Sequence, residues 1–265
     1  MARSLQHGLD LWGASLTIGP FMKQALILVC LVFGLAGCVN VSKDRREQLR
    51  RDTDVTKPQA MPARRAYLRD LLLGGKNPRD PDPHVRATCA QLLGEVGEPE
   101  DLDSLMVAIK GLYADDNVMV RLECAIAIGK LRYAGITDRR RKQALSELTN
   151  LLALERDTAG RIKETDYQVR NALINSLGAL GHRDSASALL DVARRMRSDL
   201  QNLETAVFTG AGEEGLFDQC LETLRLLTGV TLEKARQNRS ASDSIDDHLQ
   251  WWGERIAEMP QVPLG

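Results

Sequence analysis

Gly210, Gly212 and Gly215 have the spacing G-x-G-x-x-G, which in dinucleotide-binding units lets the backbone approach a pyrophosphate at a helix N-terminus. The carboxylates of Glu213 and Glu214 would repel that anion. The sequence also lacks the β-rich runs that would build the parallel sheet of such a unit. We therefore interpret this segment as a loop that leads into a helix, with a dinucleotide site as the alternative, and we expect no cofactor.

Cysteine and histidine are the other residues that could carry out catalysis or bind a metal. No Cys-x-x-Cys pair with a nearby histidine indicates a metal site, and no Ser/His/Asp arrangement indicates a nucleophile. The histidines fall on separate predicted elements, and the cysteines occupy one apolar position of a repeated helix: His84, His182 and His248; Cys89, Cys124 and Cys220. We expect buried cysteines, no catalytic residue, no metal and no small-molecule substrate.

Cys38 has a different context. Lys23 precedes an apolar run of about 11 residues, which is too short to span a ~30 Å hydrocarbon core, and small residues follow it. The sequence Leu35-Ala36-Gly37-Cys38 resembles the lipobox of bacterial lipoproteins. That resemblance implies cleavage between Gly37 and Cys38. It also implies that the cysteine carries a diacylglycerol group and acyl chains such as palmitate. The alternative is a buried apolar helix with a chance cysteine.

A lipid-anchored protein of the cell envelope follows from that resemblance, and Val39 after the cysteine favours the outer membrane, facing the periplasm. Met22 is then the better translation start than Met1. Removing residues 1–37 takes away two basic residues and one acidic residue, so 35 − 2 = 33 and 36 − 1 = 35 leave a net charge of −2. This balance gives no basic field for nucleic acid.

One sequence phrase recurs along the rest of the chain. It starts at Val85-Arg86, Val120-Arg121 and Val169-Arg170, with a diverged copy at Leu216-Phe217. Apolar residues at i, i+4, i+8 and i+11 predict a helix in each copy. Capping residues precede the helices, and a glycine that costs roughly 1 kcal/mol against alanine recurs inside them, which predicts close approach of a neighbouring backbone: Asp82, Asn117 and Asp166; Gly94, Gly129 and Gly178.

A second amphipathic helix follows each copy, and the helix pairs resemble HEAT and HEAT-like repeats over about Pro81 to Thr228. The resemblance implies an all-α fold, a short right-handed α-solenoid of helical hairpins with N- and C-terminal capping helices. The fourth copy departs from the pattern, with Phe217 in place of arginine and Arg225 in place of glycine.

The expected organisation has six parts. Residues 1–37 are a mis-assigned start plus signal peptide, and 38–61 are the lipid anchor and a flexible tether. Residues 62–80 form the N-terminal capping helix and a turn, and 81–228 form the repeats. Residues 229–258 form a loop and the C-terminal capping helix, and 259–265 are a disordered tail.

Arginines and acidic residues recur at the repeat period, and in HEAT repeats such an Asp/Arg ladder ties neighbouring repeats together. The ladder residues are Asp82, Arg86, Asn117, Arg121, Asp166 and Arg170, with Asp80, Asp115 and Glu164 two residues before the caps. An anion-binding arginine row is the alternative. Candidate partner contacts are Arg139, Arg140 and Arg141, whose charges oppose the dipole of the helix they begin, and Trp251. A solvated turn is the alternative for the arginines, and a role in the helix that caps the last repeat is the alternative for Trp251.

These features favour an interaction scaffold over an enzyme. We expect an α-solenoid anchored in the envelope through Cys38 that holds an unidentified protein partner. HEAT-like repeats also occur in bilin lyases and their relatives, so an enzyme or accessory protein of that type is one alternative. A purely structural envelope component is another.

Overall fold

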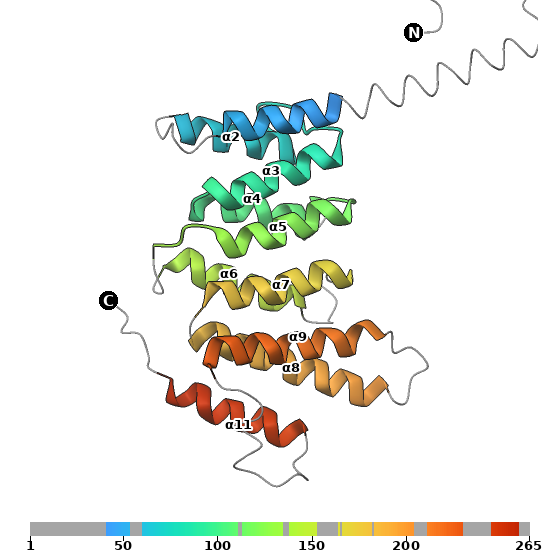
Figure 1. The fold of residues 1–265 in the computed structure, drawn as a ribbon, viewed down its shortest axis with the longest axis vertical. Helices are drawn as coiled ribbons and strands as arrows, with labels where there is room; N and C mark the ends of the chain where they lie inside the picture. The colour runs from blue at the N-terminus through green and yellow to red at the C-terminus, as the bar shows by residue number, and fades with distance from the viewer. Residues whose placement is uncertain are drawn as a thin grey trace, which may run out of the picture. The chain divides into compact units, whose positions relative to one another are not determined.

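The computed structural model describes residues 41–53, 60–110, 113–134, 138–152, 164, 166–181, 183–203, 211–229 and 245–259 (Figure 1). Secondary structure in these residues is helical, with no strand among them. They divide between one unit that ends at Arg45 and a second from Arg46 to Gly265. The signal segment, Gly37 and Cys38 lie outside the described residues, as do Gly210, His182, most of the 229–244 loop and the tail after Met259.

The second unit is an α-solenoid of two helical layers (Figure 1). In the first layer α3 packs on α5, α5 on α7 and α7 on α9. In the second layer α2 contacts α4, and α4, α6, α8 and α11 follow in turn. The bounds are α2 Met61–Leu73, α3 Pro83–Val96, the 3₁₀ helix η3 Pro99–Asp101, α4 Leu102–Ile109, α5 Val118–Lys130, α6 Arg139–Leu152, α7 Tyr167–Leu180, α8 Arg183–Leu203, α9 Ala211–Thr228 and α11 Ile245–Glu258.

The caps begin the helices where the sequence predicts. The Asp82 side chain accepts a hydrogen bond from the His84 amide at 2.8 Å, and Asn117 accepts one from Met119 at 2.9 Å. Asp166 caps α7 in the same way. The side-chain oxygen satisfies a donor that the first helical turn leaves open, which fixes where each helix starts.

The glycine column confirms the predicted close approach. A Cβ added to Gly94 would lie 2.8 Å from the Ala127 Cα of α5, and one added to Gly129 would lie 3.0 Å from the Ser176 Cα of α7. The glycines therefore let the first-layer helices pack backbone against backbone. The apolar stripes form the core between the layers and include Cys89, Cys124 and Cys220, each 0% exposed.

The diverged fourth copy is α9, which is the final first-layer helix among the described residues. α9 packs on one side of α7, but no described helix packs on the corresponding side of α9. Phe217 therefore occupies the arginine position as a buried apolar residue. Arg225 can replace the glycine because it is not required to admit another backbone, and it pairs with Glu222 on its own helix. Both departures are consistent with the end of a layer.

The structure differs from the expected flexible tether at residues 41–52, which are helical. Within the second unit, Leu49 is 5% exposed and belongs to the core. The Arg50 side chain donates to Gln91 of α3 at 3.5 Å. Leu49 is an apolar residue among mixed charges, and its burial in the core stabilises this helix.

The closing helix is α11, which packs on α8. Leu249, Trp252 and Ile256 are buried on its inner face. Arg194 of α8 donates to the Leu249 carbonyl at 3.4 Å. Within the described ranges, no helix is both long and apolar enough to cross a bilayer.

Candidate functional site

The arginine column connects consecutive repeats. Arg86 of α3 donates to Asp115 through Nε at 2.7 Å and Nη2 at 2.9 Å. Arg121 of α5 donates to Glu164 through Nε at 2.8 Å. In both cases Nη1 also donates to a backbone carbonyl before the arginine's own helix, that of Asp80 or of Asp115, at 2.8 Å. Each guanidinium therefore holds the turn of its own repeat against the acidic residue of the next.

The carboxylates of this ladder lie two residues before the capping column. Asp115 Oδ1 accepts a hydrogen bond from the backbone N–H of Asn117 at 2.9 Å, and Glu164 Oε1 accepts one from the backbone N–H of Asp166 at the same distance. Asp82, Asn117 and Asp166, which are expected both as caps and in the ladder, cap their helices, and the carboxylates that pair with Arg86 and Arg121 are those of Asp115 and Glu164. Arg170 is 2% exposed in the same column.

Electrostatics agree with a structural role for the ladder. The hydrogen bond with Asp115 raises the pKa of Arg86, although burial opposes this rise. Burial would raise the pKa of Asp115, but the hydrogen bonds from Arg86 and the Asn117 amide outweigh it and hold the pKa below its usual value. Arg86 and Arg121 are therefore engaged by carboxylates within the fold and Arg170 is buried, so the described part of the chain does not present these arginines as an open row for an external anion.

Two of the three arginines considered as partner contacts also serve the fold. Arg141 is 7% exposed and donates to the carbonyl oxygens of Leu180 and Gly181 at the C-terminus of α7. Its burial lowers its pKa. It is not available to a partner, and it places a positive charge where the dipole of α7 favours one. Arg140 pairs with Asp103 of α4 at 2.9 Å, and Arg139 is exposed.

Trp251, the remaining candidate contact, is half-buried. Its ring centroid lies 6.0 Å from that of Trp252, and the Arg255 guanidinium lies 5.6 Å from the Trp251 ring centroid. The ring packs against the core. These contacts fit the cap alternative better than a free aromatic anchor.

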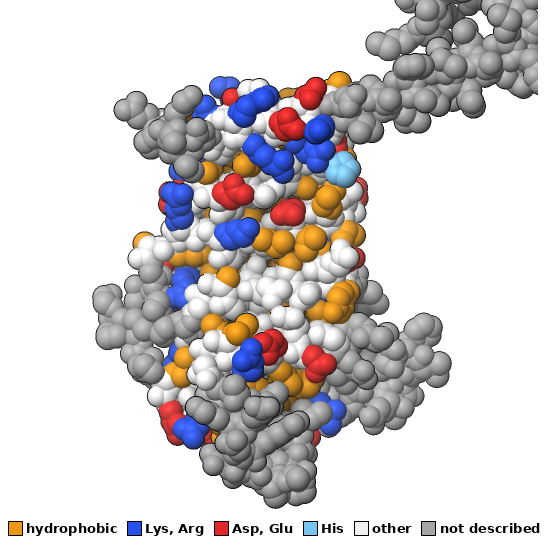
Figure 2. Space-filling view, in the orientation of Figure 1, with side chains coloured by type: hydrophobic (Ala, Val, Ile, Leu, Met, Phe, Trp, Pro, Cys, Tyr) orange, Lys and Arg blue, Asp and Glu red, His pale blue; other side chains and the backbone are white. Residues whose placement is uncertain are grey.

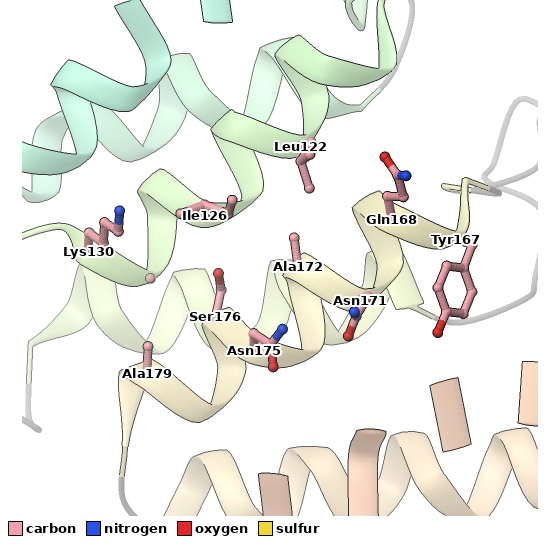
Figure 3. A pocket seen from close by; sticks show the side chains of 11 residues that line it. Leu122, Ile126, Lys130, Tyr167, Gln168, Asn171, Ala172, Asn175, Ser176 and Ala179 are labelled. Carbon is pink, nitrogen blue, oxygen red and sulfur yellow. The ribbon is translucent and has the colours of Figure 1, made fainter. Parts of the chain in front are cut away.

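An open groove lies between α5 and α7, and no motif in the sequence marks it. The groove has a volume of about 350 Å³. Figure 3 shows Leu122 and Ile126 of α5 along one side and the outward side chains of α7 along the other. The full lining is Leu122, Ile126, Gly129, Lys130, Tyr167, Gln168, Asn171, Ala172, Asn175, Ser176 and Ala179.

The α7 side of the groove carries no charge. Charged residues make up 27% of the chain, yet the only one in α7 is Arg170, which is buried. In Figure 2 the band over α7 is mainly hydrophobic and uncharged, and charged side chains lie above and below it. Charge depletion of this kind distinguishes the core of a protein interface from the rest of a surface.

The groove has a fixed floor. Ser176 Oγ donates to the Ala125 carbonyl of α5 at 2.7 Å, beside the close approach of Gly129 to Ser176. On the far side of α7, Gln219 of α9 donates to Asn175 Oδ1 at 2.9 Å. Because these contacts hold α5, α7 and α9 together, a ligand would meet a preformed surface.

The cysteines of the described residues are buried in the core. Among the described residues, no group of three or more His, Cys, Asp or Glu side chains could hold a metal ion. Burial raises the pKa of the Cys124 thiol well above its ordinary value and that of Cys220 to about 12. A thiol in such an apolar site stays protonated near neutral pH.

The described helices define an all-α solenoid of stacked hairpins. A model of the family described as HEAT repeats matches residues 76–162, which contain α3 to α6. This part of the chain therefore carries HEAT repeats, and α7 and α9 continue the same stack beyond it. No curated protein matches the chain.

Proposed function

We propose that this chain is a protein-binding HEAT-repeat module that holds its partner in the groove between α5 and α7. The uncharged outward face of α7 carries the proposal. Protein interfaces exclude charge from their centre because an unpaired charge is costly to desolvate, and α7 presents about four turns without one.

Other features support binding rather than catalysis. The groove has an apolar wall on α5 and an amide-bearing wall on α7, and its floor is fixed by packed backbones. HEAT repeats generally mediate protein–protein interaction, and the groove lies partly on the segment that matches this family. The arginines of the repeats are occupied in joining one hairpin to the next.

We further propose that the module acts in the cell envelope as a lipoprotein, anchored by acyl chains on Cys38. The support is the signal-like segment and the Leu35-Ala36-Gly37-Cys38 sequence. Stable anchoring needs more than one acyl chain, because a single chain gives a binding constant of only ~10⁴ M⁻¹. The partner is then another protein of the envelope, most simply at the outer membrane.

Site-specific photo-crosslinking tests the proposed groove. A photoreactive amino acid replaces Asn175 of α7 in one variant of the full chain and Asn150 of α6 in the other, and both are expressed in the native host. Both residues are exposed asparagines on helices, and they lie in different layers. We expect one discrete adduct from position 175 and none from 150. The absence of an adduct at 175, or the same adducts at both positions, contradicts the proposal.

A further inference from the structure

The amide side chains of α7 indicate what kind of protein segment the groove can bind. We infer that the groove binds an uncharged, extended peptide segment and reads its main chain with Gln168, Asn171 and Asn175. This inference rests on the proposed function, and it adds the conformation and the charge of the segment that is bound.

The hydrogen-bonding capacity of these amides is largely unused. Asn175 accepts the bond from Gln219, but within the described residues its Nδ2 has no acceptor. The Asn171 Oδ1 atom has no donor in the same part of the chain, and because it is shielded from solvent it reaches an occupant only when the side chain rotates. The Gln168 amide has no side-chain partner there either. A primary amide offers two donors and one acceptor, which complement the C=O and N–H groups of a peptide.

An extended segment uses these groups better than a helix does. The backbone donors and acceptors of a helix are spent on its own hydrogen bonds, so the amides of α7 could contact only its side chains. An extended chain leaves its N–H and C=O groups open along both edges. The amide-bearing wall therefore favours an occupant with an unsatisfied main chain.

The dimensions of the groove set the length of the segment. From Leu122 to Lys130 on α5 the groove runs about 12 Å at a rise of ~1.5 Å per residue. An extended peptide covers that distance with about four residues, at ~3.3 Å each. Alternate side chains of such a peptide point one way, so about two of them would point into the groove, where Leu122 and Ile126 provide apolar surface.

Charge complementarity selects against acidic and basic segments. Lys130 is the one charged residue in the described lining, and it lies at the end of the groove. Glu222 and Arg225 of the neighbouring α9 already neutralise each other. A charge buried along the centre of the groove would meet amide and methyl groups instead of a counter-ion.

Two display libraries presented to the full chain, purified in detergent, test this inference. One displays random linear heptapeptides, and the other displays the same diversity on the exposed face of a helical hairpin. We expect enrichment of linear peptides that carry no net charge in their central four residues and have aliphatic residues at alternating positions. Their affinity, measured by fluorescence anisotropy, should fall about five- to tenfold in Asn175→Ala and in Asn171→Ala. The matched variant Asn150→Ala should leave it unchanged.

Backbone N-methylation of the selected peptide gives a readout that side-chain packing would not. It removes one main-chain donor and keeps the side chain, so methylation at a central residue should weaken binding at least tenfold. Insensitivity to methylation, enrichment from the helical library alone, or selected peptides with charged centres would overturn the inference. A discrete crosslink from position 175, together with no enrichment from the linear library, would overturn only the inference of an extended peptide and leave the proposed function standing. Failure of both experiments removes the proposed function as well.

Discussion

Arg86 of α3 and Asp115, two residues before the cap of α5, form a two-point ion pair that joins consecutive hairpins. The arginine side chain is 9% exposed and the aspartate 2%. The same Asp115 carboxylate accepts the Asn117 amide and so orders the turn that starts α5. One carboxylate therefore couples the spacing of two repeats to the initiation of a helix.

Asp115→Asn should be strongly destabilising. It keeps the shape of the side chain but removes the charge that compensates a buried Arg86, and breaking a buried pair in this way costs about 3–5 kcal/mol. Urea unfolding followed by far-UV circular dichroism would measure the loss. Glu222→Gln breaks an ion pair on the exposed face of α9 and should leave the unfolding midpoint where it is. Equal effects of the two substitutions would contradict the role given to Asp115.

The same pair predicts an acid-dependent stability. The folded-state pKa of Asp115 lies below its ordinary value of 3.8, so its contribution to stability is present above that value and is lost as pH falls through the lower folded-state pKa. The difference in unfolding free energy between the wild type and Asp115→Asn should be constant from neutral pH down to roughly pH 5 and should shrink below about pH 4. A difference that grows towards low pH would show that the sign is wrong.

Gly94→Ala should destabilise the stack although alanine is the better helix former. The new Cβ would lie 2.8 Å from the Ala127 Cα, and relieving such overlap costs about 1–3 kcal/mol. The intrinsic helix preference returns only ~1 kcal/mol. Arg225→Ala changes the same repeat position in α9, where no described helix packs, and should be tolerated. Thermal unfolding of both variants checks the prediction, and a stabilised Gly94→Ala would refute the close packing of α3 and α5.

Cys38→Ser should release the protein from membranes. Without the thiol there is no site for the acyl chains, so the variant should fail to incorporate labelled palmitate in cells. It should appear in the supernatant after membranes are sedimented and salt-washed, whereas the wild type should sediment. Cys30→Ser is the matched control, because it changes a cysteine within the segment that the proposed cleavage would remove. If the wild type carries no lipid, the lipoprotein proposal fails.

Much of the fold follows from the local sequence. The remaining features depend on contacts between repeats. The caps and the glycine column were predictable because each acts within one helix or at one repeated position. The ladder was assigned to the capping residues, which lie two positions after the carboxylates that pair with the arginines. Spacing within a repeat does not show that Arg86 reaches forward to Asp115 of the next repeat. Arg141 looked available because its acceptors, the carbonyls of Leu180 and Gly181, lie far along the chain.

In the sequence, the only sign of the groove is the lack of charged residues on one face of α7. Gln168, Asn171, Ala172, Asn175 and Ala179 fall on one outward face of α7, and none of them is charged. No motif marks such a face, and the helical period alone cannot separate an open surface from one covered by another element. The apolar side of the groove, Leu122 and Ile126, looks in sequence like part of an ordinary core stripe.

The affinity of the partner identified by crosslinking, measured for three forms of the full chain, tests the central claim most directly. Asn175→Arg places an uncompensated charge in the middle of the groove, and Asn150→Arg places the same charge on α6 as a control. We predict that Asn175→Arg weakens binding at least tenfold, or about 1.4 kcal/mol, and that Asn150→Arg leaves it within about twofold. Equal affinities for all three forms would show that the partner binds elsewhere.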